Sequence, residues 1–249
     1  RRSGLCYGTL QGTNPKSVIH EIVKDPHYPL VTDTHMNPHL IGPRTVGFNS
    51  GHLWNVDSTN PRSVSNAMQQ GRQLAHQFHE GLKQYFPSAF SSSMLINTAS
   101  VIGTREGRRI VGDYRMTIDD YLSKRTFPDE VCRNSYYIDV HLTQEELDKA
   151  SRNGISRESI NRRYKPGESH GIPLRSLLPR GLVNVIAAGR TISCDREILG
   201  SVRVMPNCLC TGEAAGMAAA HALQANGNVH QVDVSRLRER LREVGAYFL

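Results

Sequence analysis

The chain has 249 residues, of which 38% are hydrophobic and 21% charged, and this balance excludes a disordered chain because enough apolar side chains are present to fill a core. No apolar run reaches the roughly 18 residues of a membrane-spanning helix, so we expect no membrane contact. The net charge of +7 could attract nucleic acid, but Lys and Arg are dispersed and seldom alternate with aromatic residues, which favours a ligand with phosphate or carboxylate groups instead.

The first 57 residues predict short strands and long loops. They are rich in Gly, Pro, Asn and His, and their apolar runs, such as residues 18–23, are short. The first residue is Arg1 rather than Met, so we expect the true start of the protein to lie upstream. The 5 cysteines of the chain do not suit a disulfide framework, which favours a reducing, cytoplasmic setting.

A long amphipathic helix is predicted from Pro61 to the residue before Pro87. Apolar side chains recur between these prolines at roughly helical spacing, and proline suits the first position of a helix but stops one later. His76 and His79 lie on this helix, but no third ligand is evident, so the spacing predicts no metal site.

Short strands and helices are predicted across the middle of the chain. Residues 94–102 and 109–111 are expected to form two strands joined by a charged turn, as in a hairpin. Thr117, followed by two aspartates, predicts a short capped helix. The alternation in residues 136–140 predicts another strand, and residues 143–152 are expected to form a helix.

The last third of the chain predicts a strand, a ligand-binding loop and a helix in succession. Residues 181–188 form an apolar run that is typical of a buried strand and that ends at Gly189. Proline opens a predicted helix over residues 206–225. A last helix is expected over residues 234–244, with its two leucines pointing inward and its arginines mostly outward.

The strongest functional signal lies between Gly189 and the helix that starts near Pro206. A glycine after an apolar strand lets the backbone approach a ligand closely, and a helix start presents free amides and the positive end of the helix dipole. An anionic ring or a phosphate needs these properties. A generic buried strand and helix pair would have the same spacing, so the spacing alone leaves both interpretations open.

Four strings in this chain resemble, in the same order, the FAD-dependent oxidoreductases of the fumarate reductase and succinate dehydrogenase flavoprotein type, in particular a branch of mostly uncharacterised bacterial FAD enzymes. They are VDSTNPRSVSNAMQQGRQ, IGTREGRRIVGDYRMTIDDYL, SYYIDVH and HGIPLRSLLPRGLVNVIAAGRTISCDREILGSVRVMPNCLCTGEAAGMAAA. The resemblance implies an α/β protein with a Rossmann-like FAD-binding domain and a mixed-sheet substrate or cap domain. On this basis residues 1–175 are expected to form mainly the cap domain and residues 176–249 to complete the FAD domain.

The resemblance also implies a set of cofactor contacts. The turn at Gly189 would lie beside the ribityl chain and pyrophosphate of FAD. The turn over residues 203–208 would run along the isoalloxazine ring, with the amides of Asn207 and Cys208 at its N1 and C2 edge. The expected cofactor-binding residues are Gly189, Arg190, Arg109, Met205, Pro206, Asn207 and Cys208.

Charged and polar side chains are expected on the substrate side of the ring. Arg105, Arg108 and Arg109 match the arginine-rich hairpin of the family, and guanidinium groups at such a turn can grip a carboxylate or phosphate. Three solvated charges on a hairpin tip would have the same sequence. Arg203 is expected to anchor a substrate anion or to hold charge near the flavin, whereas His141 could equally be a structural histidine. The expected catalytic residues are Arg203, Arg105, Tyr114 and His141.

The chain lacks the G-x-G-x-x-G fingerprint that grips the pyrophosphate of FAD in a dinucleotide-binding domain. We therefore expect a further N-terminal FAD domain as a partner, besides a small anionic or polar substrate. The expected function of the complete protein is hydride transfer between an organic substrate and N5 of FAD. The alternatives are a non-catalytic subunit or remnant that completes a partner's flavin site, and a basic nucleic-acid-binding protein.

Overall fold

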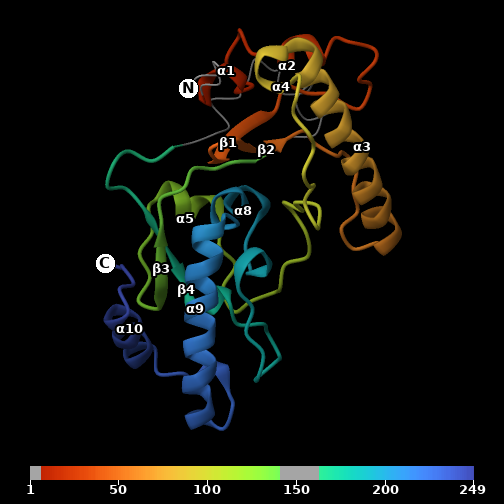
Figure 1. The fold of residues 1–249 in the computed structure, drawn as a ribbon. Helices are drawn as coiled ribbons and strands as arrows, with labels where there is room; N and C mark the ends of the chain where they lie inside the picture. Colours follow the sequence, from red (N-terminus) through yellow and green to blue (C-terminus); the bar gives the residue numbers. More distant parts are fainter. Residues whose placement is uncertain (1–6, 141–162) are drawn as a thin grey trace. The chain divides into compact units, whose positions relative to one another are not determined.

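The computed structural model describes residues 7–140 and 163–249, which form two compact units divided between Thr104 and Arg105 (Figure 1). Both units combine helices with a two-stranded antiparallel sheet, so the chain is mixed α/β. The expected helix over residues 143–152 lies outside the described residues. The expected domain boundary at residue 175 stays a prediction, and one apolar core in the second unit includes residues on both sides of it.

The first unit holds a hairpin and a long helix. Residues 18–23, whose short apolar run suggested strand and loop, are largely helical, because Ile19 and Ile22 are three residues apart and both fully buried. The two strands pair antiparallel with a shift in register near Gly42. The elements are α1 (Tyr7–Leu10), α2 (Ile19–Ile22), β1 (Met36–Gly42), β2 (Thr45–Ser50), α3 (Pro61–Tyr85) and α4 (Pro87–Phe90).

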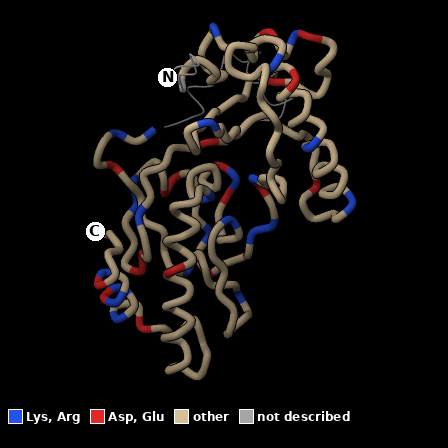
Figure 2. Tube along the Cα trace, viewed as in Figure 1, with Lys and Arg blue, Asp and Glu red and all other residues tan. Residues whose placement is uncertain are grey.

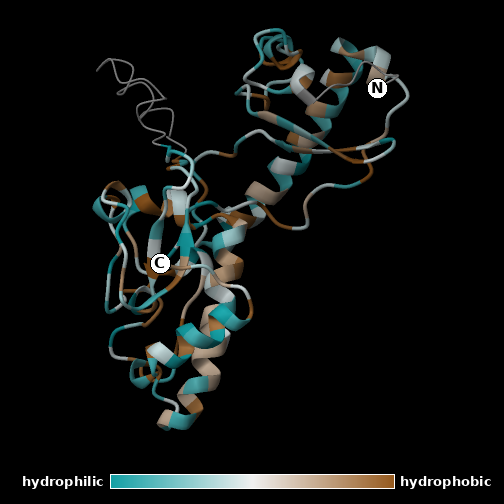
Figure 3. Ribbon diagram, turned by 90° about the vertical axis from the view of Figure 1, so that its left-hand side faces the viewer, coloured by the Kyte–Doolittle hydropathy of each residue, from teal (hydrophilic) through white to brown (hydrophobic). Residues whose placement is uncertain are grey.

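The long helix α3 begins at the predicted residue and ends within one residue of the predicted end. The Asn60 side chain accepts hydrogen bonds from the amides of Arg62 and Ser63 at 3.0 and 3.4 Å, which caps the helix start. Apolar and polar positions alternate around the helix (Figure 3), and its buried face packs into the core of this unit. The buried apolar side chains of that face include Leu74, Phe78 and Leu82.

The second unit is built around α9 and a short antiparallel pair of strands, β3 with β4. The helices predicted after Thr117, near Pro206 and from residue 234 are confirmed. In α10 the two leucines are buried, and Figure 2 shows basic and acidic positions interleaved along the helix. The elements are α5 (Ile118–Leu122), β3 (Glu130–Asn134), β4 (His170–Pro173), η1 (Leu174–Ser176), η2 (Gly189–Thr191), α8 (Arg196–Val202), α9 (Met205–Ala222), η3 (Leu223–Ala225), η4 (Val229–Gln231) and α10 (Val234–Glu243).

The hairpin expected from residues 94–102 and 109–111 is wrong, as is the strand over 136–140. The first segment is irregular, because its apolar side chains find no core: Met94 and Ile96 are 78% and 71% exposed. Residues 109–111 bond to another segment instead, where the Ile110 amide donates to the Thr191 carbonyl at 2.9 Å. The strand near position 136 lies slightly earlier, as β3, because β4 pairs only with residues up to Asn134.

The buried strand expected over residues 181–188 is also wrong. Leu182 and Val183 expose 50% and 57% of their surfaces, and the segment has no strand neighbour within the described residues. It is held by single hydrogen bonds, such as that from the Val229 amide to the Val183 carbonyl at 2.8 Å. An apolar run alone does not make a buried strand, because a strand needs adjacent backbone to complete its hydrogen bonds.

A buried ion pair anchors the start of β3. Arg133 Nη1 lies 2.9 Å from Glu130 Oε2, and the two side chains are only 3% and 0% exposed. We expect Arg133→Met to lower the free energy of unfolding by about 3 to 5 kcal/mol, because the Glu130 charge would remain buried without its partner. Urea denaturation measures this loss.

The matched control is Arg240→Met, which breaks the exposed ion pair between Arg240 and Glu243 on α10. Exposed pairs contribute at most about 1 kcal/mol, so the control is expected to change stability little. Equal losses in both variants would contradict the role assigned to the Arg133 pair.

His230 connects the exposed segment near Leu182 to Asp113 of the second unit through hydrogen bonds. Its Nε2 lies 3.0 Å from the Leu182 carbonyl oxygen and its Nδ1 lies 2.7 Å from Asp113 Oδ2. Each of these oxygens accepts a hydrogen bond, so each ring nitrogen must carry a proton. Only the protonated, positively charged imidazole has an N–H at both nitrogens. The hydrogen bond to the Leu182 carbonyl, followed by that to Asp113, raises the pKa of His230.

This raised pKa predicts a pH-dependent contribution to stability. Because the folded pKa lies above the unfolded value of about 6.5, the contribution is complete below that pH and is lost as the pH rises through the folded pKa. We expect His230→Gln to lower the melting temperature clearly at a pH of about 5.5 and much less at about 9. A loss that is the same at both pH values would show that the contacts do not depend on the protonated ring.

Candidate functional site

The start of α9 presents unpaired backbone donors. Val204 precedes the helix and provides no side-chain cap. The Cys208 amide donates to the Val204 carbonyl at 3.0 Å, so this amide, which was expected to face a ligand, is engaged within the helix. The amides of Met205 and Asn207 come before it and have no partner inside the helix, as in the first turn of any helix. This end of an 18-residue helix therefore combines open donors with a positive dipole end.

Gly189 lies against the first two turns of α9. Its φ of +69° is in the left-handed region, which glycine adopts freely. Its amide donates to Thr211 Oγ1 at 3.0 Å, and a Cβ atom added here would lie 3.5 Å from Cys208 Sγ. The structure thus brings together the two segments that the sequence predicts to bind one ligand. Thr211 was not predicted, although a hydroxyl among the small residues of this helix is a usable signal.

Arg203 and Arg105 meet at one carboxylate, that of Asp139. Arg203 Nη2 donates to the Asp139 carbonyl oxygen at 2.6 Å and lies 3.3 Å from Oδ2. Arg105 Nη1 lies 3.8 Å from the same Oδ2. Burial, followed by the nearby charge of Arg203, lowers the pKa of Arg105. Two cations share one anion here, which leaves net positive charge for an anionic ligand. Asp139 was not predicted, and an acidic residue inside the apolar SYYIDVH string was the available signal.

Gly200 allows the segment that carries Asp139 to approach α8. A Cβ atom added at Gly200 would lie 3.0 Å from a methyl group of Val140 and 3.1 Å from the backbone of Asp139. The contact is strengthened by Ser201, whose hydroxyl donates to the Tyr136 carbonyl at 2.6 Å. The position of Asp139 is therefore fixed by backbone packing, and this packing places the carboxylate beside Arg203.

The charges of Arg190 and Arg203 both act on Cys208. Its thiol donates to the Arg203 carbonyl at 3.2 Å. Burial raises the pKa of the Cys208 thiol, and the charges of Arg190 and Arg203 partly oppose this rise. A thiol in this state is a poor nucleophile at neutral pH. Arg190 itself is exposed in η2, and its charge acts on this thiol in the first turn of α9.

Tyr114 belongs to a different network. Its hydroxyl donates to Asp120 Oδ1 at 2.8 Å and accepts from Arg125 Nη1 at 3.0 Å. Burial, followed by the hydrogen bond to Asp120, raises the pKa of Tyr114 to about 12. These partners hold the hydroxyl in a structural role within α5 and the residues after it. The other expected proton carrier, His141, lies outside the described residues.

Arg109 contains a buried donor that no described group satisfies. The side chain is half-buried, and its Nη1 atom has no hydrogen-bond partner among the described residues. Its charge also acts on the buried thiol of Cys194, whose pKa burial raises to about 12. An unpaired buried guanidinium donor is costly, so a bound anion at this position would relieve the cost. Arg108, by contrast, is exposed.

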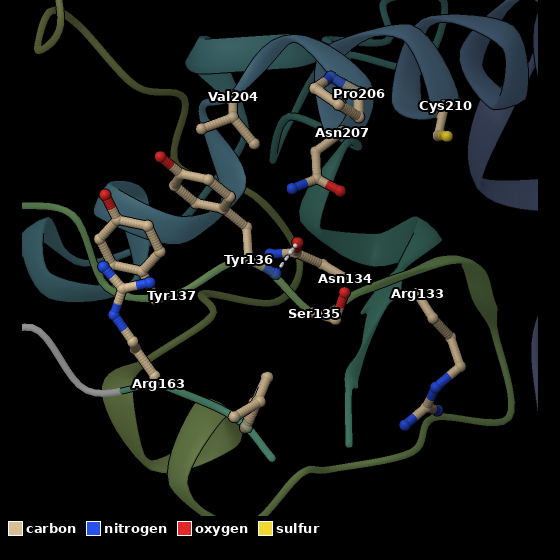
Figure 4. A pocket seen from close by; sticks show the side chains of 11 residues that line it. Arg133, Asn134, Ser135, Tyr136, Tyr137, Arg163, Val204, Pro206, Asn207 and Cys210 are labelled. Atoms are coloured by element: carbon tan, nitrogen blue, oxygen red, sulfur yellow. Dashed lines mark hydrogen bonds between the residues drawn. The ribbon is translucent and has the colours of Figure 1, made fainter. Parts of the chain in front are cut away.

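A pocket of about 400 Å³ adjoins the first turns of α9 (Figure 4). Val204 and Pro206 form part of one wall, and the side chains after β3 form another. The rings of Tyr136 and Tyr137 lie 4.5 Å apart, and Arg163 Cζ lies 4.1 Å from the centre of the Tyr137 ring. The other lining residues are Arg133, Asn134, Ser135, Tyr164, Asn207 and Cys210.

Neither metal ligation nor a membrane span is evident in the described part of the chain. Across residues 7–140 and 163–249, no group of three or more His, Cys, Asp or Glu side chains is arranged to hold a metal ion. Within the same ranges, no helix combines the length and the apolar character needed to span a bilayer.

Comparison with known proteins gives one broad result. The model of a family described as FAD dependent oxidoreductase matches residues 14–241. No curated protein and no solved structure gives a significant match. The matched range includes Gly189, Arg203 and the start of α9.

Proposed function

The chain belongs to the FAD dependent oxidoreductase family, and from this premise we propose that the complete protein transfers a hydride between an organic substrate and N5 of FAD. FAD is the cofactor of the family, whose members are described as oxidoreductases. The observation that carries the proposal is the meeting of Gly189, the open first turn of α9 and the Arg105 and Arg203 pair in one region. Donors and positive charge there match a cofactor and substrate that are both anionic.

The residues present fit an isoalloxazine ring with its ribityl and phosphate chain. When bound, FAD supplies the hydride acceptor, and its reduced ring carries negative charge near N1 and C2. The Met205 and Asn207 amides would hold that edge through donors fixed before the reaction, which is an efficient form of electrostatic stabilisation. Gly189 leaves room for the chain beside η2, and the unpaired Arg109 nitrogen supports an anion contact.

The substrate would be bound by the arginine pair. Arg203 is held by the carbonyl and carboxylate of Asp139, so its guanidinium is oriented before a ligand arrives. Arg105 adds a second positive charge next to it. Such a pair would hold negative charge at the reacting end of the substrate, beside the flavin.

Within the family, the order of the four strings supports the fumarate reductase and succinate dehydrogenase flavoprotein type. Proteins of this type have a Rossmann-like FAD domain and a cap domain, and we propose the same two parts for this protein. A non-catalytic subunit is the second candidate, favoured by the lack of a G-x-G-x-x-G string in the sequence. In both cases we expect an N-terminal FAD domain as the partner.

FAD titration tests this division of contacts. We expect the chain alone to bind FAD several orders of magnitude more weakly than it does with an N-terminal FAD domain supplied, because each lost charge-assisted bond contributes roughly 1.5 to 3 kcal/mol. Flavin fluorescence gives the affinity. Submicromolar binding by the chain alone would show a phosphate site of its own, and no binding in either case would contradict the proposed function. Slow or absent flavin reduction by organic acids in the combined protein would favour the non-catalytic subunit.

A further inference from the structure

The pocket beside α9 has an aromatic wall that the flavin contacts leave unexplained. The rings of Tyr136 and Tyr137 lie 4.5 Å apart and are inclined by 31° (Figure 4). The Arg163 guanidinium lies over the Tyr137 ring, 4.1 Å from its centre. Three planar groups therefore follow one another along this wall. Planar side chains in such a series favour a planar ligand, because aromatic contacts gain from both buried area and ring electrostatics.

The side-chain amides of the pocket already form hydrogen bonds within the protein. Asn134 donates to Ser201 Oγ at 2.7 Å and accepts from the Tyr136 amide at 2.9 Å. Asn207 donates to the Ser201 carbonyl at 3.2 Å. These contacts hold the pocket in shape and leave its charged groups to recognise a polar ligand. The charged group at the stacked end is Arg163, which is exposed and can pair with a carboxylate.

The pocket has the size and position of a substrate site. Its volume of about 400 Å³ is within the range of pockets for small organic molecules. Val204 and Pro206 provide apolar surface opposite the tyrosines. Arg203 directly precedes Val204 of the pocket, and its Nη2 donates to the carbonyl of Asp139, two residues after Tyr137, so the arginine pair lies close to this wall.

We propose that this pocket binds the body of the substrate, and that the substrate is a carboxylic acid that carries an aromatic or other planar ring. The ring would lie on the tyrosine wall between Tyr136 and the apolar side formed by Val204. The carboxylate would pair with Arg163. The role of this acid as a substrate rests on the proposed function, whereas its binding requires only the residues of this pocket.

Calorimetric titration of the full chain with three probes tests the ligand class. Benzoate has both a ring and a charge, benzamide keeps the ring without the charge, and succinate keeps the charge without the ring. We expect benzoate to bind at least about tenfold more tightly than either, because each of the others loses one of two recognition elements. Equal binding of benzamide would overturn the role of charge, and equal or tighter binding of succinate would overturn the role of the ring. No detectable binding of benzoate would overturn the proposal as a whole.

Two variants locate the site. Arg163→Gln changes an exposed side chain and is expected to remove the preference for benzoate over benzamide. Tyr137→Leu is expected to weaken benzoate roughly three- to tenfold through loss of one aromatic contact. Tyr247→Leu, at a tyrosine that is 67% exposed near the C-terminus and does not line the pocket, is the matched control and should leave binding unchanged. Unchanged binding in both pocket variants would place benzoate elsewhere and overturn the proposal.

These measurements separate the inference from the proposed function, because they are made without FAD. Benzoate binding by the chain, together with no FAD binding in the combined protein, would contradict the proposed function alone. FAD binding and flavin reduction in a protein that fails to distinguish the three probes would contradict the pocket assignment alone.

Discussion

Replacing Gly189 by Val in the complete protein is expected to abolish FAD retention. The native φ of +69° is strongly disfavoured for a β-branched residue, with a strain of roughly 1 to 3 kcal/mol. The new Cβ would contact Cys208 Sγ at 3.5 Å, and its two methyl groups would extend into the space between η2 and α9. That space is where the ribityl chain is proposed to lie. Flavin absorbance of the purified protein measures the loss.

Gly227→Val is the matched control for backbone strain. Gly227 has a similar φ of +77° but has nothing within 4 Å of the added Cβ, and it lies in the turn after η3. Both variants are expected to lose stability to a similar extent, and only Gly189→Val is expected to lose the flavin. A Gly189→Val protein with normal flavin content would refute the position assigned to the cofactor.

Replacing Arg203 by Ala is expected to slow flavin reduction by the substrate by about 10² to 10³, the usual cost of removing one preorganised donor. FAD retention should change far less, because the proposed cofactor contacts come from η2 and from backbone amides of α9. Stopped-flow absorbance gives the reduction rate, and the flavin content of the same preparation gives retention. Benzoate serves only as a binding probe, because it has no saturated carbon that could give up a hydride. The first substrates to test are therefore ring-bearing acids with a saturated carbon between the ring and the carboxylate.

Arg203→Lys distinguishes charge from geometry. Arginine can use Nη2 for the carbonyl and the carboxylate of Asp139 and still offer its other N–H groups to an anion, whereas lysine keeps the positive charge in a single ammonium group. We expect a rate between those of Arg203→Ala and the unchanged protein. Arg240→Ala, on the exposed face of α10, should leave the rate unchanged. Equal loss of rate and of flavin in Arg203→Ala would place this side chain in cofactor binding.

The sequence predicted the helices because their signals are local. For α3, the capping Asn60, the proline after it and the apolar spacing all lie within the helix or next to it. The same holds for α9 and its early proline. The strands were harder to predict, because a strand depends on its neighbour. Residues 181–188 have the composition of a central strand, yet no described strand lies beside them.

The candidate site was predictable in its segments but not in its connections. The turn at Gly189, the start of α9 and Arg203 were found by their residue types and by the family resemblance. The hydrogen bond between Arg203 and Asp139 was not predicted. It depends on Gly200, which allows the segment that carries Asp139 to approach α8. Two hydrogen bonds depend on the exact residue at which α9 begins. They are the bond from the Cys208 amide to the Val204 carbonyl and the bond from the Gly189 amide to the Thr211 hydroxyl.

Amide hydrogen exchange of the complete protein, with and without FAD, is the most direct test of the central claim that Gly189 and the start of α9 together hold the flavin. We expect FAD to slow exchange most in peptides that cover residues 188–192 and 204–208, the second of which includes the Asn207 amide in the first turn of α9. Bound FAD that leaves exchange in both peptides unchanged would contradict the account.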